Sequence, residues 1–347
     1  MKVLEADKIG SATSSLKLTK SVSVIDSCDA PKVGDVVVVR ALSESVTYGN
    51  LELPSGRLAK INTNDVLLGV LGKRRALKGF VGDVPDAIKA GDKLHLLNMG
   101  GVIGICKGHH SSLSDAIQVE VLGIACGEDE HILNIANNAL KPTDFLEKSA
   151  PVVVVAGTCM NSGKTVAVTE IIKQAHHAGL KIAGGKLSGV AALRDTLNMQ
   201  DSGACATASF LDCGLPSTVD AGNLAPLAKA ILNKLNESKP DLIIVELGDG
   251  IVGGYAVDSI LQDAEIKAAT AAFVFCASDY VGVIGGIEVL RRLGIEIDVI
   301  AGSVTDSQMG EDFVQKEFGI NAGNARRDGL RLFELIKFAK QNELAFA

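Results

Sequence analysis

Near the middle of this chain, a run of four valines leads directly into a short polar turn and then into Gly-Lys-Thr at 163–165. The valine run, residues 152–155, is typical of a strand buried on both faces. Apolar residues then recur every three or four positions across 168–175, which is the spacing of one helix face. The order of strand, short loop and helix predicts a P-loop, in which backbone amides bind phosphate.

The predicted phosphate-binding residues form one continuous stretch: Gly157, Thr158, Cys159, Met160, Asn161, Ser162, Gly163, Lys164 and Thr165. In a P-loop, the lysine contacts the β- and γ-phosphates of a nucleotide and the Ser/Thr hydroxyl is a ligand of Mg²⁺. Lys164 and Thr165 are the candidates for these two roles.

Composition indicates an ordinary globular protein. The 347 residues suffice for about two domains. Apolar residues make up 47% and charged residues 22%, while aromatic residues reach only 4%, with no Trp. The net charge is −7, without a block of like charges. Few aromatic stacking platforms and an acidic balance argue against a nucleic-acid or anionic-membrane partner. We therefore expect a small-molecule substrate, and leave open whether the chain forms a homodimer.

The seven cysteines stand singly and form no C-x-x-C pair. We interpret them as reduced, mostly buried thiols in a cytoplasmic protein. The N-terminal residues lack the apolar segment of a secretory signal, and no apolar run has transmembrane length.

The two halves of the chain differ in pattern. Residues 1–140 hold short β-rich runs separated by turn signals, which predicts a β-rich barrel or sandwich domain. Residues 130–141 predict a short helix leaving it, and 141–151 predict a linker. From 152 to 347, strand-like and helix-like segments alternate. This alternation predicts an α/β domain with a doubly wound, mostly parallel sheet.

In that second half, the expected strands lie near 152–155, 181–183, 241–246, 271–278 and 295–303. The expected helices lie near 166–178, 224–236 and 328–342, and the stretch 282–294 separates the last two strands. Residues 190–222 show no clear elements. Because a long segment of this kind inside a compact domain is usually functional, we expect the second substrate there, although no residue in it can be assigned a role from sequence.

An acidic partner for the P-loop is predicted at the end of the strand at 241–246. Four apolar residues there lead to Glu246, as in a Walker B strand. Glu246 would assist the metal or orient an attacking group. Asp249, three residues later, is a second candidate metal ligand, and equally a turn residue.

The loop departs from the usual G-x-x-x-x-G-K-[ST] pattern, because Thr158 stands where the first glycine would be. Five residues separate Gly157 from Gly163, and in this spacing the loop resembles the dethiobiotin-synthetase branch of the P-loop NTPases. The resemblance covers roughly 152–305. It implies an ATP- and Mg²⁺-dependent ligase on a P-loop fold.

Two further segments carry this resemblance. Residues 246–254 look like the glycine-rich loop that follows the acidic strand in that family, although Leu247 and Asp249 depart from it. Residues 181–189 look like its Lys-Pro-Val-x-x-Gly segment, with Leu187 in place of the proline. There, a lysine faces the reacting carboxylate or carbamate, and the resemblance puts Lys186 in that position.

Our leading hypothesis is therefore an enzyme that binds ATP with Mg²⁺ and acts on a carboxylate- or carbamate-like acceptor, with Lys164, Lys186 and Glu246 as catalytic residues. A second hypothesis is a nucleotide-driven switch, although that class usually carries an additional lysine early in its P-loop, and this loop has none. A third is coenzyme-A-dependent N-acyl transfer. The chain also resembles an uncharacterised P-loop family with an extra N-terminal domain, some of whose members look like amino-acid N-acyltransferases.

Overall fold

The computed structural model describes residues 2–339, which form two compact units. The first, here called the β unit, comprises the chain up to Leu140 together with Val190–Arg194 and Phe210–Val219. The second, the α/β unit, comprises Lys141–Gly189, Asp195–Ser209 and the chain from Asp220 onward. Two short segments from the second half of the sequence thus pack with the first.

The β unit contains β1 (Lys2–Glu5), β2 (Lys8–Ile9), β3 (Ser21–Ile25), β4 (Ser27–Cys28), β5 (Val36–Ala41), β6 (Asn50–Glu52), β7 (Leu58–Lys60), β8 (Val66–Leu71), β9 (Arg74–Arg75), β10 (Phe80–Asp83), β11 (Ile88–Lys89), β12 (Lys93–Asn98), β13 (Val102–His109) and β14 (Gln118–Cys126). Pairing runs β14-β5-β8-β13-β12 and returns from β12 to β14, so these strands close a barrel. Closure leaves no unpaired edge in this ring.

Strand β5 shows why the barrel is buried on both sides. Val37 and Val39 belong to the aliphatic cluster with Leu67 and Leu96, whereas Val36 and Val38 belong to a second cluster. Alternate side chains of a strand point to opposite faces, so one cluster fills the barrel and the other covers its outer wall. The outer cluster includes Ala191, Phe210 and Leu211 from the two inserted segments.

The prediction of a helix at 130–141 is wrong. The structure has only a 3₁₀ turn at Ile135–Asn138, in addition to an earlier one at Ser11–Leu16. The side chain of Asn134 accepts a hydrogen bond from the amide of Ala136 and starts this turn. Asparagines are poor formers of a helix interior, and the amide of Leu140 donates to the carbonyl of Asp212 (2.7 Å), which ends any continuation.

The α/β unit contains β15 (Val152–Gly157), β16 (Ile182–Ser188), β17 (Ala206–Ser209), β18 (Leu242–Leu247), β19 (Thr270–Cys276), β20 (Val299–Ala301) and β21 (Asn321–Ala322). They form one sheet in the order β17-β16-β18-β15-β19-β20-β21, with every pair parallel. The chain builds outward from β15 to one side and then to the other. The carboxyl end of β15 is therefore a topological switch point, where ligands of such sheets bind.

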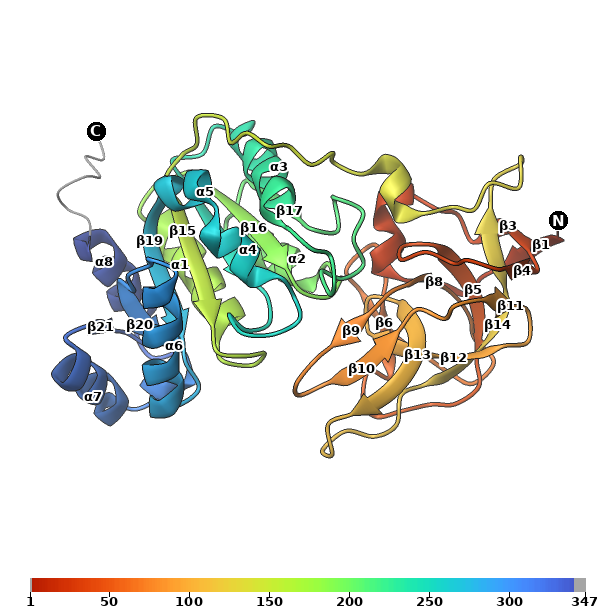
Figure 1. Ribbon diagram of the computed structural model, residues 1–347, viewed down its shortest axis with the longest axis horizontal. Helices are drawn as coiled ribbons and strands as arrows, with labels where there is room; N and C mark the ends of the chain where they lie inside the picture. Colours follow the sequence, from red (N-terminus) through yellow and green to blue (C-terminus); the bar gives the residue numbers. More distant parts are fainter. Residues whose placement is uncertain (1, 340–347) are drawn as a thin grey trace. The chain divides into compact units, whose positions relative to one another are not determined.

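Its helices are α1 (Lys164–His177), α2 (Arg194–Asp201), α3 (Ala225–Asn236), α4 (Val257–Gln262), α5 (Ala264–Ala269), α6 (Tyr280–Arg292), α7 (Gln308–Phe318) and α8 (Gly329–Ala339), with a 3₁₀ turn at Ser303–Thr305. Apolar residues of α1, α2 and α8 share one core cluster with Val153, Val155 and Val274. On the other face, α3 approaches Gly185 and α6 approaches Phe275. Helices thus cover both faces, and the predicted doubly wound α/β fold is confirmed (Figure 1).

Several local expectations need correction. Residues 190–222 are not featureless, because they contain α2 and β17. The strand expected at 295–303 is only Val299–Ala301, because Asp298 turns back to hydrogen-bond both the amide and the carbonyl of Phe273. The last helix is described to Ala339, and the remainder of its expected range, 340–342, lies outside the described residues.

All seven cysteines are free, but "mostly buried" was too strong an expectation. Cys126, Cys213 and Cys276 are buried, three others are half-buried and Cys205 is exposed. Within residues 2–339, no helix combines the length and apolar character needed to span a bilayer.

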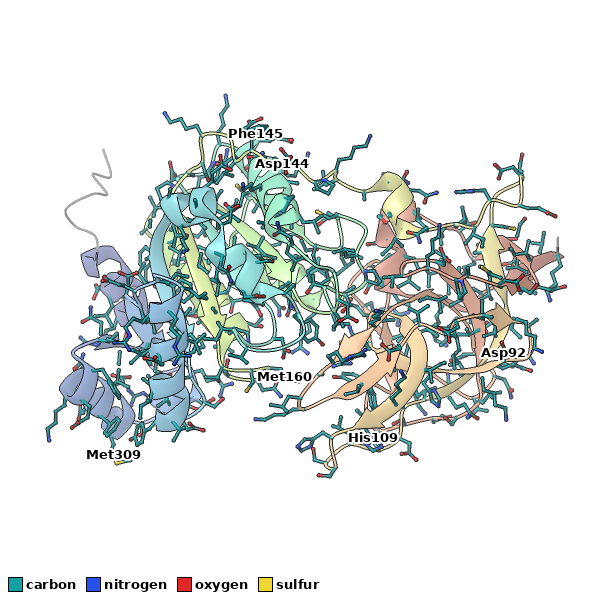
Figure 2. All side chains as sticks on the ribbon, viewed as in Figure 1. Asp92, His109, Asp144, Phe145, Met160 and Met309 are labelled. Atoms are coloured by element: carbon teal, nitrogen blue, oxygen red, sulfur yellow. The ribbon has the colours of Figure 1, made fainter. Side chains whose placement is uncertain are left out.

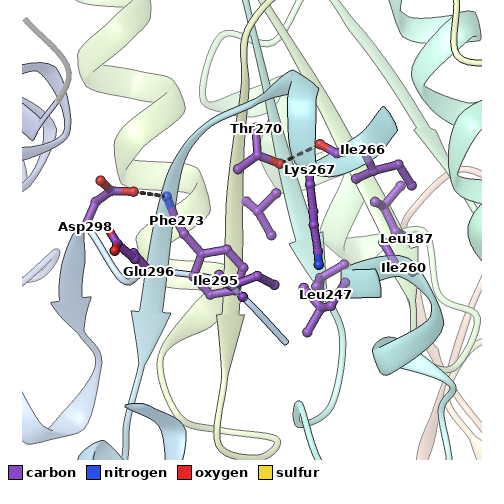
Figure 3. Close-up of a pocket in the computed structure, with 13 residues that line it drawn as sticks. Leu187, Leu247, Ile260, Ile266, Lys267, Thr270, Phe273, Ile295, Glu296 and Asp298 are labelled. Carbon is purple, nitrogen blue, oxygen red and sulfur yellow. Dashed lines mark hydrogen bonds between the residues drawn. The ribbon is translucent and has the colours of Figure 1, made fainter. Parts of the chain in front are cut away.

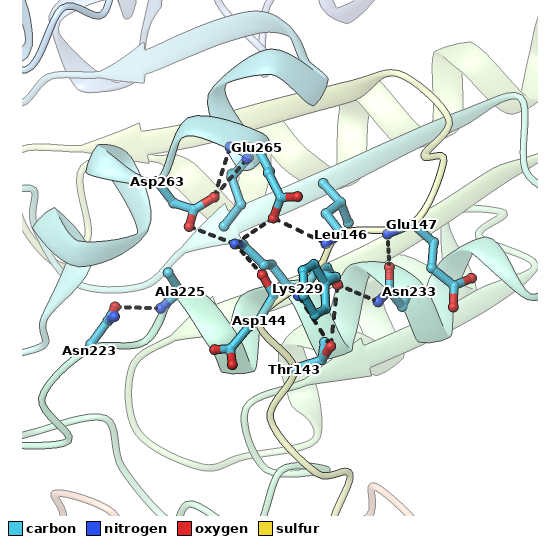
Figure 4. Close-up of polar contacts among 12 residues, drawn as sticks. Thr143, Asp144, Leu146, Glu147, Asn223, Ala225, Lys229, Asn233, Asp263 and Glu265 are labelled. Atoms are coloured by element: carbon cyan, nitrogen blue, oxygen red, sulfur yellow. Dashed lines mark hydrogen bonds and ion pairs between the residues drawn. The ribbon is translucent and has the colours of Figure 1, made fainter.

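The segment 141–151 lies along α3 rather than hanging free (Figure 4). The ammonium group of Lys229 donates to the carbonyl of Asp144 (3.0 Å), and the side-chain carbonyl of Asn233 accepts from the amide of Glu147 (2.9 Å). Lys229 also forms ion pairs with Asp263 and Glu265. One face of α3 therefore fastens this segment to the α/β unit.

Candidate functional site

The loop between β15 and α1 turns sharply through two left-handed residues. Asn161 has φ +65° and Gly163 has φ +103°. A side chain at Gly163 would be doubly unfavourable, because its Cβ would also come within 2.9 Å of the Cα of Gly302. Met160 lies on this loop beyond the end of β15 (Figure 2).

Neighbouring strand ends hold the loop in place. The amide of Thr158 donates to the carbonyl of Cys276 at the end of β19 (3.0 Å), and the amide of Ile251 donates to the carbonyl of Gly157 (3.0 Å). On the far side, the amide of Ser303 donates to the carbonyl of Ser162 (3.3 Å). The loop is thus fixed by backbone contacts to the end of β19 and to the segments following β18 and β20, and this fixed conformation suits preorganised amide donors.

Helix α1 begins at Lys164 and has no side-chain cap. Its first amides have no acceptor within the helix, and the positive end of the helix dipole lies there. The ammonium group of Lys164 is buried, 5% exposed for the residue, and folds back to donate to the carbonyl of Cys159 (2.7 Å). An anion placed against these amides would meet both the helix terminus and the charge of Lys164.

A carboxylate lies directly beside this helix terminus. Glu246 emerges near the end of β18, is 3% exposed, and accepts a hydrogen bond from the hydroxyl of Thr165 (3.1 Å) through Oε1. Its other oxygen, Oε2, is buried and has no hydrogen-bond partner among the described residues. A buried carboxylate oxygen without a hydrogen-bond donor lowers the stability of the fold, so Oε2 of Glu246 is a candidate contact for a bound ligand.

Lys186 joins the same group from the adjacent strand. β16 and β18 pair in parallel with Lys186 opposite Glu246, and the ammonium Nζ lies 4.0 Å from Oε1. Lys186 also forms a hydrogen-bonded ion pair with Asp195 near the start of α2. The structure thus brings together Lys164, Thr165, Lys186 and Glu246, four residues selected from sequence, and adds Asp195.

Asp195 was missed as an individual residue. It lies in the segment 190–222, where sequence offered carboxylates but no way to choose among them. The only local signal is its position in the first turn of α2, the helix that follows β16. Its ion-pair partner, Lys186, is nine positions away in sequence.

The third predicted metal ligand, Asp249, lies in the loop after β18 with a left-handed backbone, φ +65°. Asp and Asn tolerate this conformation better than other non-glycine residues, which accounts for a turn role. At the end of β19, burial raises the pKa of the Cys276 thiol to about 12, so this thiol stays neutral.

The donor set fits Mg²⁺ bound together with phosphate. Thr165 and Glu246 offer a hydroxyl and a carboxylate, both oxygen ligands. Over residues 2–339, no group of three or more His, Cys, Asp or Glu side chains is arranged to hold a metal ion alone. Mg²⁺ usually takes one or two protein oxygens and completes its shell with phosphate and water, so these two residues suffice.

A separate cavity of about 230 Å³ lies on the face of the sheet covered by α4 and α5 (Figure 3). Its lining is largely aliphatic and includes Leu187, Leu247 and Phe273. The amine of Lys267 lies at this cavity and donates to the carbonyl of Leu293 (2.6 Å). No residue of the loop 157–165 lines it, so this apolar hollow is distinct from the candidate polyphosphate site.

The sequence matches no protein-family model and no curated protein. Its structure is similar over part of its length to the signal recognition particle receptor FtsY from Elizabethkingia anophelis (12% identity, 59% of this chain and 74% of that one, TM-score 0.38). It is also similar to FtsY from Thermotoga maritima (15%, 58% and 73%, TM-score 0.39) and to a DUF1611 family protein from Anabaena variabilis (13%, 61% and 66%, TM-score 0.41).

The molecule's own geometry defines its class. The parallel sheet has β15 between β18 and β19, a loop with left-handed residues at the switch point, and a helix that starts at Lys164; these features define the α/β unit as a doubly wound α/β fold with a P-loop-like strand, loop and helix.

Proposed function

We propose that the α/β unit is an enzyme that binds ATP with Mg²⁺ at Gly157–Thr165 and transfers the γ-phosphoryl group to a small carboxylate- or carbamate-like acceptor. One observation carries this proposal: the carboxylate of Glu246 links the P-loop residue Thr165 to Lys186, which is in turn paired with Asp195. Phosphate-binding and acceptor-binding groups thus meet at adjacent strand ends. The similarity of these segments to the dethiobiotin-synthetase branch supports the same chemistry.

Each residue has a definable task. The loop amides and Lys164 bind and orient the polyphosphate. Thr165 and Glu246 would hold Mg²⁺, which supplies charge neutralisation to the phosphate oxygens when bound. Lys186 would attract the anionic acceptor and stabilise negative charge in the transition state, while Asp195 holds its ammonium group in place.

In this reaction an acceptor oxygen forms a bond to the γ-phosphorus while the bond to the β,γ-bridging oxygen breaks. A nucleoside diphosphate leaves and an acyl or carbamoyl phosphate is formed. Because the acceptor is already an anion at neutral pH, no proton has to be removed from it. The residues therefore act by positioning and by charge, which is the usual means of catalysis in phosphoryl transfer.

A second candidate follows from the orphan oxygen of Glu246. The same loop amides suit the pyrophosphate of coenzyme A, and a buried carboxylate with a free lone pair would accept the proton of an amine during N-acyl transfer. A third candidate is a nucleotide-driven switch, in which hydrolysis serves a conformational change.

Thermal-shift measurements with Mg·ATP, Mg·GTP and acetyl-coenzyme A separate these candidates. Ligand at 100 times its dissociation constant stabilises a protein by about 2.7 kcal/mol, which is readily detected as a rise in Tm. We expect Mg·ATP to give the largest rise and Lys164→Ala to remove most of it.

Lys173→Ala is the matched control, because Lys173 lies on the same helix but is exposed and pairs with Glu170. It should leave the ATP-induced rise intact. A larger response to acetyl-coenzyme A than to ATP would favour acyl transfer, and an unchanged Tm with every ligand would overturn the proposal of a polyphosphate site. The mass of a small molecule that co-purifies with the protein would identify the acceptor.

A further inference from the structure

The aliphatic cavity on the α4 and α5 face of the sheet has no part in the proposed phosphoryl transfer. Its volume is about 230 Å³, and the lining residues Leu187, Leu247 and Phe273 are each at most 2% exposed. Protein interiors are close-packed and hold few voids larger than a water molecule, so a hollow of this size is unusual. An engineered apolar cavity of about 150 Å³ binds benzene, so about 230 Å³ accommodates a ligand of roughly nine non-hydrogen atoms.

The cavity lies on the opposite face of the sheet from the candidate phosphoryl-transfer site. Glu246 contacts Thr165 at the start of α1, and Leu247 directly follows Glu246 on β18. Because successive side chains of a strand point to opposite faces, Leu247 faces away from α1 and lines the cavity. On β16, Leu187 directly follows Lys186 and lines the same cavity. A ligand bound here is therefore separate from one bound at Gly157–Thr165.

One end of the cavity carries a cation with donors to spare. Lys267 on α5 is half-buried, and its ammonium group donates to the carbonyl of Leu293 (2.6 Å). It forms no ion pair with any carboxylate among residues 2–339. An ammonium group has three N–H donors, so two remain for a ligand. A carboxylate is the group that two such charged donors bind most strongly.

The carboxylates of the lining do not compete for this ammonium group. Asp298 accepts from the amide of Phe273 (2.7 Å), and Glu296 is exposed. Figure 3 shows both carboxylates across the lining from Lys267. Because Gly294 and Glu296 are exposed, the cavity reaches the surface in the segment between α6 and β20, which gives a ligand a way in.

We propose that this cavity is a second ligand site of the α/β unit and binds a small aliphatic carboxylic acid. The hydrocarbon chain, of about six to eight carbon atoms by the volume, packs against Leu187, Leu247 and Phe273. The carboxylate accepts hydrogen bonds from the ammonium group of Lys267. Burial of the chain supplies affinity, and Lys267 supplies selectivity for an anionic head group. The site lies outside the proposed reaction and does not depend on it.

The test is calorimetric titration of the full chain with sodium octanoate, 1-octanol and octylamine, which share a chain and differ in charge. We expect octanoate to bind wild type at least tenfold more tightly than either of the others. Lys267→Met removes the charge and keeps an apolar stem, so it should weaken octanoate at least tenfold and leave octanol within twofold of wild type. Lys181→Met is the matched control, because the ammonium group of Lys181 also donates to a backbone carbonyl, that of Ser238, but lies outside the cavity. It should leave all three affinities within twofold.

Two further variants locate the bound molecule. Ile295 is a half-buried residue of the lining, and the larger side chain of Ile295→Phe would fill part of the cavity. We expect Ile295→Phe to weaken octanoate and octanol alike, each at least tenfold. Lys186→Met should leave the affinity for octanoate within twofold of wild type, because Lys186 does not line the cavity.

The inference is overturned if octanoate does not bind, if Lys267→Met binds it as tightly as wild type does, or if octylamine is preferred. It is also overturned if Lys186→Met abolishes octanoate binding, since the carboxylate would then occupy the phosphoryl-transfer site. If Lys267→Met does not fold, Lys267→Gln serves in its place, and the same loss is expected because its amide carries no charge. A protein that binds octanoate but no nucleotide would contradict the proposed function and leave this inference standing.

Discussion

Two buried lysines of the α/β unit each face two carboxylates, yet their surroundings differ. Lys186 on β16 pairs with Asp195 and lies near Glu246, whereas Lys229 on α3 pairs with Asp263 and Glu265. We call these the Lys186 cluster and the Lys229 cluster. Both satisfy the rule that a buried charge requires a counter-charge.

In the Lys229 cluster, the two carboxylates also accept hydrogen bonds from backbone amides. Asp263 caps α5 by accepting from the amides of Glu265 and Ile266 (3.0 Å each), and Glu265 accepts from the amide of Leu146 (3.2 Å) (Figure 4). In the Lys186 cluster, Oε2 of Glu246 has no hydrogen-bond partner among residues 2–339, and Oε1 contacts Thr165 at the end of the loop between β15 and α1. The comparison separates a cluster that fastens chain segments from one with unused binding capacity.

The largest effect should come from Lys186→Met. Removing the ammonium group takes away the charge proposed to bind the acceptor and stabilise the transition state, and losses of such electrostatic groups cost on the order of 100-fold in kcat. We expect the ATP-induced rise in Tm to persist, because Lys164 and the loop amides remain. Steady-state kinetics and thermal shift on one preparation measure both. A wild-type kcat in Lys186→Met would contradict a catalytic role for the Lys186 cluster.

Lys229→Met should show the opposite pattern. Its loss leaves the carboxylates of Asp263 and Glu265 without a cation and frees the carbonyl of Asp144, for about 1–3 kcal/mol of lost stability. Since about 1 kcal/mol shifts Tm by a few degrees in a unit of this size, a drop of several degrees is expected. Turnover measured well below the lowered Tm should be near that of wild type. A kcat defect as large as that of Lys186→Met would erase the distinction between the clusters.

The smallest effect concerns the pH dependence of the Lys229 cluster. The hydrogen bond from Lys229 lowers the pKa of Glu265 below its ordinary 4.5. Burial by itself would raise the pKa of Asp263, but hydrogen bonds from the Ile266 amide and from Lys229 outweigh it and leave the pKa below 3.8. Because these folded-state pKa values are lowered, the ion pairs contribute stability above the ordinary pKa and lose it as the pH falls through the folded-state values.

Glu265→Gln should therefore lower Tm by a small, constant amount at neutral pH, and its difference from wild type should shrink as the pH falls below about 4.5. Glu237→Gln is the control, because Glu237 pairs with Lys234 on the exposed end of α3 (2.6 Å) and fastens no other segment. It should change Tm less at every pH. A difference for Glu265→Gln that grows on acidification would contradict the assigned direction of the pKa shift.

Local sequence was sufficient where contacts are local. The valine run before Gly157, the glycine at 163 and the apolar spacing of 168–175 each select strand, turn and helix through neighbours a few residues away. The parallel sheet followed from alternation, because parallel strands need helical crossovers. Where the pattern was weak, as at 130–141, asparagine capping and a long-range backbone hydrogen bond replaced the expected helix with a 3₁₀ turn.

The candidate site divides along the same line. Lys164, Thr165 and Glu246 could be selected because a phosphate-binding loop and an acidic strand end have sequence signatures. Asp195 could not, because nothing near it in sequence distinguishes it from other carboxylates. Its partner is Lys186 on β16, and only the fold brings the two side chains together.

By itself, the sequence determined the alternation of strands and helices from 152 onward and the strand, loop and helix around Gly157–Thr165, because backbone dihedral preferences and apolar periodicity act over a few residues. Only the tertiary structure decided which carboxylate faces which lysine, and that Val190–Arg194 packs with the β unit rather than with the strands on either side of it. The physical reason is that charge pairing and burial act through distance in space. The number of residues between two side chains does not predict their distance in space, which depends on which strands pair in the sheet.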